Sequence, residues 1–444
     1  GWRAYYRPTQ FSRISLEYHT TNEFRRGGNK FDLQPHETDI TEQTKHIINS
    51  GGLTYDVFFN EYKHKLSVYA SAQHTDRNSY YGADKAENAY GKTKDLTAVG
   101  GAMYVGNMDN CLFSPATFTG GLEYQYNSLH DVMTGYGRDL RQDVKIASGF
   151  VQNEWKLDYF TILAGFRLDK HNLVDNVIFS PRINTLWKPS DKFQGRLTWS
   201  TGFRAPQAYD EDLHVAAVGG EAMEVRLAEG LKPERSNSFS GSVDWSFNFG
   251  HFQSNLLIEG FYTALNDVFY LESLGKDPVS GTLVQERRNG NGARVYGANI
   301  DYKIAHGKEA QLQLGFTVQR SRYTEAVRWS EDEDVAAIKR MPRTPDYYGY
   351  FTFSSAPLKN FDFSLSGVYT GRMIVPHFAG YIEKDRLEHT PDFMDFNLKL
   401  NYTFVLNDHL KLQVNGGVQN IFNAFQKDLD KGMNRDSKYF YGPT

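Results

Sequence analysis

Strict alternation of apolar and polar residues is the feature that most constrains how this chain can fold. Between residues 394 and 404 every even position is apolar and every odd position is polar, and the same period of two runs through 239–249 and 410–418. Side chains alternate between two faces only in an extended strand, so this period predicts β-strands. No segment of the sequence has a convincing helical spacing.

The predicted strands are too long for most soluble sheets. Strands of soluble domains usually have about 5–6 residues, whereas a tilted strand of about 9–11 residues crosses a membrane. A closed barrel is the sheet that leaves no backbone group unpaired in lipid. Aromatic pairs such as Tyr5-Tyr6 and Tyr80-Tyr81 resemble the girdles of such barrels. We therefore predict an all-β fold, a large antiparallel transmembrane β-barrel of the bacterial outer membrane. A soluble propeller or sandwich is the alternative, but repeats of about 40–50 residues are absent.

Composition excludes several other classes of protein. No stretch reaches the roughly 18–20 apolar residues of a membrane-spanning helix. The charge is nearly balanced, at 49 Lys and Arg against 53 Asp and Glu, which argues against a nucleic-acid partner. A single cysteine, Cys111, excludes a disulfide framework and a cysteine-built metal site. We also find no nucleophile elbow, H-E-x-x-H pair, P-loop or EF-hand loop, so we expect no enzymatic activity.

The predicted connections are of two kinds. Short polar turns are expected at 7–10, 60–63, 188–191, 305–308, 357–360 and 406–409, and long loops at 27–37, 83–94, 207–234, 326–343 and 378–390. In outer-membrane barrels the periplasmic turns are short and the outer loops are long. The chain then contains about 18 strands, the first near 1–7 and the last near 409–423. A barrel of that size is too wide for its own side chains to fill, so its lumen is open or plugged.

The direction of the strands predicts that residues 1–444 form part of one barrel. The first strand runs into a short turn, so it descends, and the last counted strand leaves a short turn, so it ascends. We therefore expect an odd number of strands before Gly1 and at least one after Thr444. About 18 strands, with three before and one after, would complete a barrel of about 22 strands, the size of plugged transporters.

Residues 193–245 contain two motifs that resemble a known family. The motifs are Phe203-Arg204-Ala205-Pro206 and Leu231-Lys232-Pro233-Glu234. Their order resembles the TonB-dependent outer-membrane receptors, in which G-F-R-A-P leads into a loop and L-K-P-E-x-S opens the next strand. The segments 165–169, 417–423 and 436–443 are similar to further family segments in the same order. The resemblance covers about the last 300 residues.

The resemblance implies active import of a large, scarce ligand across the outer membrane. An N-terminal plug domain, absent from this chain, would close the barrel, and the energy-transducing TonB complex would bind a short segment before that plug. We favour a metal chelate as ligand, first a cobalt corrinoid such as cobalamin (vitamin B12), because no histidine pair stands out. Haem or a ferric siderophore, either of which would make the protein an iron transporter, is the alternative ligand, and no intrinsic cofactor is expected.

A surface lipoprotein is a further candidate partner besides outer-membrane lipid. A passive porin or a membrane-embedded barrel enzyme are the competing functions of another class.

Candidate ligand contacts lie in the predicted outer loops. Imidazole can ligate iron or cobalt, and aromatic rings can contact a large planar ligand. The predicted ligand-binding residues are His36, Tyr209, His214, Trp329, His377 and Tyr381. Receptors for haem in the family often place an axial histidine in the loop that holds His214. Each residue also has an ordinary alternative as a loop or girdle side chain, and no resident metal site is predicted. We expect Arg204 to face the lumen or its rim, where it pairs with a carboxylate or contacts the ligand.

Overall fold

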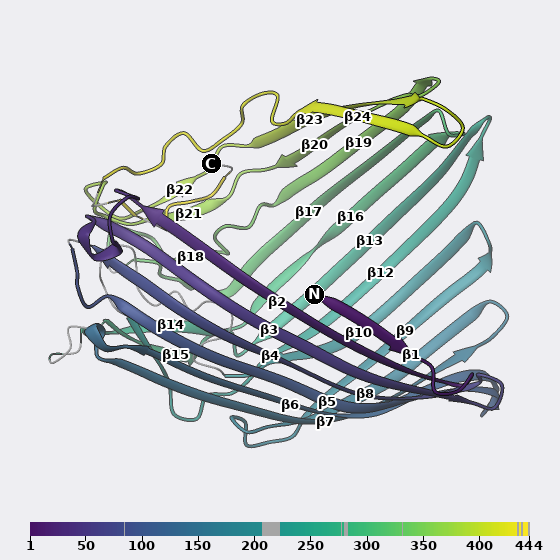
Figure 1. Ribbon diagram of the computed structural model, residues 1–444, viewed down its shortest axis with the longest axis horizontal. Coiled ribbons are helices and arrows are strands. Elements are labelled where there is room, and N and C mark those ends of the chain that lie inside the picture. Colours follow the sequence, from purple (N-terminus) through teal and green to yellow (C-terminus); the bar gives the residue numbers. More distant parts are fainter. Residues whose placement is uncertain are drawn as a thin grey trace. The chain divides into compact units, whose positions relative to one another are not determined.

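Nearly all regular structure in the computed structural model is β-strand (Figure 1). The structure describes residues 1–444 except 84, 207–222, 277, 279–282, 331, 433–434, 437 and 443–444. The chain divides into two compact units. Unit 1 is Gly1–Ile183, Ser200–Arg235 and Asp267–Gly290, and unit 2 is Asn184–Trp199, Ser236–Asn266 and Asn291–Thr444.

Unit 1 contains long strands that pair antiparallel in chain order. They are β1 (Trp2–Tyr6), β2 (Ser12–Gly28), β3 (Ile40–Phe59), β4 (His64–Ala83), β5 (Tyr90–Cys111), β6 (Ser114–Met133), β7 (Arg138–Lys156) and β8 (Phe160–His171). Two three-residue 3-10 helices, η1 (Pro35–Glu37) and η2 (Thr134–Tyr136), lie in its connections. Unit 1 also holds a small sheet of β11 (Met223–Leu227), β15 (Leu283–Asn289) and β14 (Phe269–Lys276), in that order.

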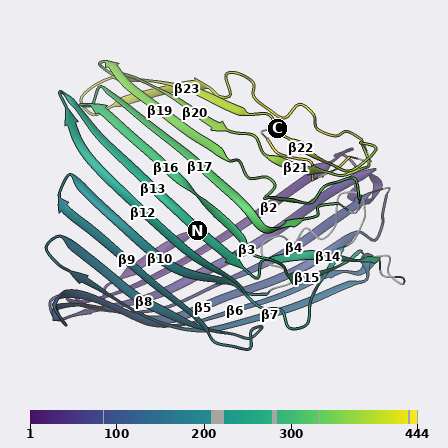
Figure 2. The same ribbon diagram turned by 180° about the vertical axis from the view of Figure 1, so that it is seen from behind.

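Unit 2 continues the same antiparallel pattern (Figure 2). The strands β9 (Ile178–Ser190), β10 (Phe193–Arg204) and β12 (Glu234–Phe249) have residues in both units. Unit 2 alone contains β13 (Phe252–Asn266), β16 (Ala293–His306), β17 (Ala310–Val327), β18 (Ile338–Arg340), β19 (Tyr347–Leu358), β20 (Phe361–Thr370), β23 (Phe393–Val405) and β24 (Lys411–Val418). A second small sheet pairs β21 (Ile374–His377) with β22 (Arg386–His389).

The described residues place 19 strands in one large sheet, and the other five strands belong to the two small sheets. One of the 19, β18, has only three residues. The remaining long strands agree with the predicted number of about 18. The sheet is antiparallel at every pairing whose register the structure describes, as the alternation predicted.

Connections alternate between short and long within each unit. The short turns include 7–11, 60–63, 307–309, 359–360 and 406–410, close to their predicted positions. One predicted loop was too long, and one long connection was missed. The loop after β4 is shorter than 83–94 because β5 begins at Tyr90, and the connection 267–292 is long although it was not predicted to be. Its strands β14 and β15 have the sequences FYLESLGK and LVQERRN, which lack the regular alternation of the wall strands.

The two faces of the sheet differ in chemistry. In unit 1 the carboxylate of Asp56 is buried, and it accepts hydrogen bonds from Ser67 Oγ at 2.7 Å and Arg13 at 2.9 Å while pairing with Lys65 at 3.0 Å. The neighbouring residue on β3, Tyr55, points to the opposite face and is exposed, as are Ile47, Leu53 and Phe59 on that face. Among the described residues no helix is long and apolar enough to cross a membrane.

Candidate functional site

The motif residues Arg204 and Glu234 meet at the start of β14 in unit 1. Arg204 ends β10 and Glu234 begins β12, and their Nη1 and Oε2 atoms lie 3.7 Å apart. Glu234 Oε1 accepts a hydrogen bond from the backbone N–H of Phe269, the first residue of β14. The Arg204 guanidinium also lies 5.8 Å from the centroid of the Phe269 ring. Arg204 therefore pairs with a strand carboxylate, and the pair holds the first residue of a loop strand.

The remaining motif residues hold the two loop ends in place. The apolar ones are buried or partly buried: Phe203, Ala205, Pro206, Leu231 and Pro233. Lys232 makes a two-way contact with Asn289 of β15, because its N–H donates to Asn289 Oδ1 at 2.8 Å and its carbonyl accepts from Nδ2 at 2.9 Å. Asn289 Nδ2 also donates to the carbonyl of Asp267 at 2.8 Å. The second motif thus fastens the start of β12 to the loop between β13 and β16.

The small sheet that these motifs support presents cations and aromatic rings. The guanidinium of Arg288 pairs with Glu272 at 2.6 Å and also with Glu286, yet 43% of its side chain remains exposed. Arg287 lies 5.7 Å from the centroid of the Phe269 ring. Partly exposed guanidinium groups and nearby aromatic rings can bind an anionic, planar ligand through charge-assisted hydrogen bonds and stacking. We find no nucleophile and base pair in the described part of this sheet.

In unit 2 the predicted ligand residue His377 is buried in a polar cluster. Its Nε2–H donates to both carboxylate oxygens of Asp430 at 3.0 Å. Its ring stacks on Tyr439, with ring centroids 3.5 Å apart and an interplanar angle of 6°. Only 3% of His377 is exposed. In this arrangement the imidazole joins β21 to the segment that follows β24, and its ring is covered.

Two tyrosines and one carboxylate extend this cluster. The hydroxyls of Tyr439 and Tyr441 both donate to Asp428, at 2.7 Å from Tyr439. Burial acts to raise the pKa of Asp428, but the hydrogen bonds from Tyr441 and Tyr439 outweigh it and hold that pKa below its usual value. Burial, and then the bond to Asp428, raise the pKa of both tyrosine hydroxyls. The three groups therefore stay as one carboxylate and two neutral phenols at neutral pH.

Arg343, in the loop before β19, forms hydrogen bonds with the same segment. Its guanidinium donates to the carbonyl oxygens of Lys438 and Phe440. Burial lowers the pKa of this guanidinium, and the nearby carboxylate of Asp436 opposes that effect. Asp436 also accepts the backbone N–H of Phe378 at 2.9 Å. The residues that follow β24 are thus fixed at several points to the loops of unit 2.

The loops that carry Trp329 and Tyr381 are tied to each other. Ser330 Oγ donates to Asp385 Oδ2 at 2.6 Å, and Lys384 Nζ lies 3.0 Å from Asp334. Trp329 is partly buried, and its ring centroid lies 6.4 Å from that of Tyr323. Tyr381 is 53% exposed. The structure therefore brings the segments of Trp329, Tyr381 and His377 into one unit and leaves Tyr381 the accessible member.

The other predicted ligand residues lie elsewhere. His36 is in η1 of unit 1, where its Nδ1 is 2.8 Å from the hydroxyl of Tyr90. Tyr209 and His214 lie outside the described residues. Among the described residues no group of three or more His, Cys, Asp or Glu side chains could hold a metal ion.

Sequence reasoning missed the partners that make these clusters. Asp430, Asp428 and Arg343 have no local pattern that predicts a site, and their contacts join segments far apart in the chain. The one available signal was the segment 436–443, which resembles a family segment and contains Tyr439 and Tyr441.

Comparisons with known proteins agree on one family. The sequence profile described as "TonB dependent receptor-like, beta-barrel" matches residues 1–421. A curated relative, the iron-regulated outer membrane virulence protein of Vibrio cholerae serotype O1, is 29% identical over 172 residues, which are 38% of this chain and 25% of that protein. The chain thus spans about a quarter of the length of this relative.

Solved structures share the fold at low sequence identity. The siderophore receptor PirA from Acinetobacter baumannii has a TM-score of 0.71 and 14% identity, over 99% of this chain and 68% of that chain. The outer membrane transporter YddB from Escherichia coli has a TM-score of 0.72 and 11% identity, over 95% of this chain and 64% of that chain.

Proposed function

The chain belongs to the TonB-dependent receptor family, as part of an outer-membrane β-barrel, and on that premise we propose that it imports a ferric chelate of the siderophore type. The family is one of receptors and transporters, which supports uptake over the porin and enzyme alternatives. The observation that carries the choice of ligand is the curated relative, whose name describes an iron-regulated outer membrane protein. PirA, described as a siderophore receptor, shares the fold.

The described loops supply chemistry that suits such a ligand. Many ferric chelates are anionic and have planar aryl groups, so they bind guanidinium groups and aromatic rings. In the small sheet of unit 1, Arg287 lies over the ring of Phe269, and the Arg288 side chain is 43% exposed beside Glu272. In unit 2 the exposed ring of Tyr381 is the accessible aromatic of the predicted set. Tyr209, His214, His36 and Trp329 remain predicted contacts.

The earlier preference for cobalamin has less support. No relative described above is named for a corrinoid, whereas two are named for iron or siderophores. Haem remains a prediction that depends on His214, because His377 is covered by Asp430 and Tyr439. Energy transduction by TonB, the plug domain upstream and a surface lipoprotein partner are parts of the same proposal that rest on family membership.

Competition binding tests the ligand. We would titrate the protein, extracted from outer membranes in detergent, with a ferric tris-catecholate siderophore, with haem and with cobalamin, by calorimetry. We expect tight binding of the ferric siderophore, and Arg288→Gln should weaken it by about tenfold, since a hydrogen bond to a charged group contributes about 1.5–3 kcal/mol. Lys308→Gln, in the short turn after β16, removes one charge far from the loops and serves as the control.

Uptake of radioactive iron by cells then tests the mechanism. Uptake should stop when the proton gradient is collapsed, because the outer membrane holds no energy source of its own. Uptake that continues would indicate a passive pore, and tight binding of cobalamin alone would assign the receptor to corrinoids.

A further inference from the structure

Three arginines lie directly opposite one another on neighbouring strands of unit 2. The register pairs Arg294 of β16 with Arg322 of β17, and Arg322 with Arg340 of β18. Residues directly opposite in an antiparallel pair have Cβ atoms about 4.5–5.5 Å apart, and like charges in such positions destabilise the sheet. A ladder of three arginines is therefore an arrangement that an anion would stabilise.

Most of this positive charge is not neutralised by the described residues. Asp346 pairs with Arg320 at 3.0 Å and with Arg340 at 3.3 Å, so one carboxylate serves two guanidinium groups. Arg294 and Arg322 are exposed, and no carboxylate in the described part of the chain pairs with either. Two guanidinium groups with free donors remain side by side, which suits a phosphate group because arginine binds phosphate oxygens in a bidentate manner.

The ladder stands on the apolar face of the sheet, at the end of the strands near the long loops. Two residues from Arg294, Tyr296 shares its face, and its ring lies 6.4 Å from that of Tyr262 on β13. Arg320 packs over the ring of Tyr347, 5.4 Å from its centroid. Beyond these aromatic rings the same face is apolar. In a barrel of the outer membrane, this face meets lipid and the long loops are on the outside, so the ladder lies at the level of the outer-leaflet headgroups.

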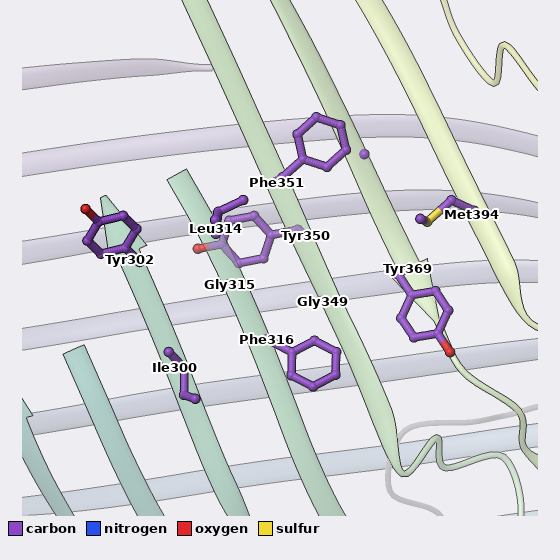
Figure 3. A pocket seen from close by; sticks show the side chains of 11 residues that line it. Ile300, Tyr302, Leu314, Gly315, Phe316, Gly349, Tyr350, Phe351, Tyr369 and Met394 are labelled. Carbon is purple, nitrogen blue, oxygen red and sulfur yellow. The ribbon is translucent and has the colours of Figure 1, made fainter. Parts of the chain in front are cut away.

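An apolar groove lies farther along the same face (Figure 3). Its volume is about 450 Å³, and its walls include Ile300, Phe316, Tyr369 and Met394. Gly349 forms part of its floor, and a Cβ there would lie 2.6 Å from the carbonyl oxygen of Gly315, so the strands are too close for a larger residue. The groove therefore exists because these strands approach closely at glycine.

The distance between the arginine ladder and the groove matches the length of a single lipid molecule. Phe316 and Arg322 are six residues apart on β17, which is about 20 Å along a strand at about 3.3 Å per residue. A tilt of about 45° reduces this to about 14 Å along the membrane normal. Half of the hydrocarbon core is about 15 Å thick. A lipid of the outer leaflet whose phosphate meets the arginines can therefore place the end of an acyl chain in the groove.

We propose that the outward face of β16 to β20 binds a phosphate-bearing, acylated lipid of the outer leaflet, with its phosphate on Arg294 and Arg322 and an acyl chain in the groove. The bound anion neutralises the arginine ladder. This site is independent of the ligand that the receptor imports.

Lipid titration of the detergent-extracted, delipidated protein tests the proposal. The probe is diphosphoryl lipid A, followed by native mass spectrometry, and we expect about one molecule retained per chain. Arg294→Gln with Arg322→Gln should weaken binding by about tenfold or more, and high salt should weaken the wild type in the same direction. Leu314→Trp, which fills the groove from an exposed position, should weaken binding several-fold.

Lys308→Gln with Lys359→Gln is the matched control, because it removes the same charge from exposed positions in the short turns at the other end of these strands. Heat-modifiable migration in gels verifies that each variant is folded. Equal binding of dephosphorylated lipid A, binding by the arginine variant within twofold of wild type, or an equal loss in the control would each overturn the proposal. So would an arginine variant that lost only self-association, because a second copy of the chain would then be the occupant.

Discussion

Replacing Asp430 with alanine should release the segment 420–442 from β21. The Asp430 side chain is 2% exposed, and it accepts hydrogen bonds from His377 Nε2 at 3.0 Å and from the backbone N–H of Asp436 at 2.9 Å. Each hydrogen bond to a charged group contributes about 1.5–3 kcal/mol, so the loss of two costs about 3 kcal/mol at the low end. Since about 1.4 kcal/mol corresponds to a factor of ten, local opening of the segment should become about 150-fold more frequent.

Hydrogen exchange measured by mass spectrometry reports this opening directly. Peptides that cover 424–432 and 438–442 should exchange about 150-fold faster in Asp430→Ala, or at the rate of an unprotected chain if the segment opens more easily than we calculate. Asp408→Ala, in the exposed turn between β23 and β24, removes one carboxylate from the same unit and should leave these peptides unchanged. Exchange in Asp430→Ala within about threefold of wild type would refute the view that this buried carboxylate holds the segment.

Two further predictions concern the other clusters. Glu234→Ala should destabilise the protein by about 1–3 kcal/mol, because it leaves the partly buried N–H of Phe269 without its acceptor, whereas Arg204→Ala removes a half-exposed pair and should cost about 1 kcal/mol or less. Denaturant unfolding of both variants measures the two losses of unfolding free energy. A larger loss for Arg204→Ala than for Glu234→Ala would contradict the prediction. The lowered pKa of Asp428 means that its contribution to stability is complete above its ordinary pKa of 3.8 and is lost as the pH falls through the lower folded value. Thermal melts between about pH 5 and pH 2 should therefore show a steeper loss in wild type than in Asp428→Asn, and parallel curves would argue against this role.

The wall of the sheet could be predicted from the sequence because strand geometry is local. The alternation over 394–404 corresponds to β23, and four of its six even residues, Met394, Leu400, Tyr402 and Phe404, are exposed on one face. A shift of one residue would move every side chain to the other face, so a long alternating run determines both the strand and its orientation. The antiparallel barrel class and the outer-membrane location are confirmed by the family.

The loops could not be predicted in the same way because their structure depends on contacts between distant segments. His377 was a sensible candidate ligand from its position alone, but its ring is covered by Asp430 and Tyr439, more than fifty residues farther along the chain. Arg204 and Glu234 were each recognised as part of a motif, but no sequence pattern predicted that both contact Phe269.

The sequence by itself determined the strands, the face that each side chain takes, the membrane setting and the family, because these follow from a period of two and from short contiguous motifs. Only the tertiary structure decided which polar groups meet. The register of three strands places Arg294, Arg322 and Arg340 side by side, and the packing of the segment after β24 buries His377. Such pairings depend on long-range hydrogen bonding between strands and loops, whose partners a local pattern does not specify.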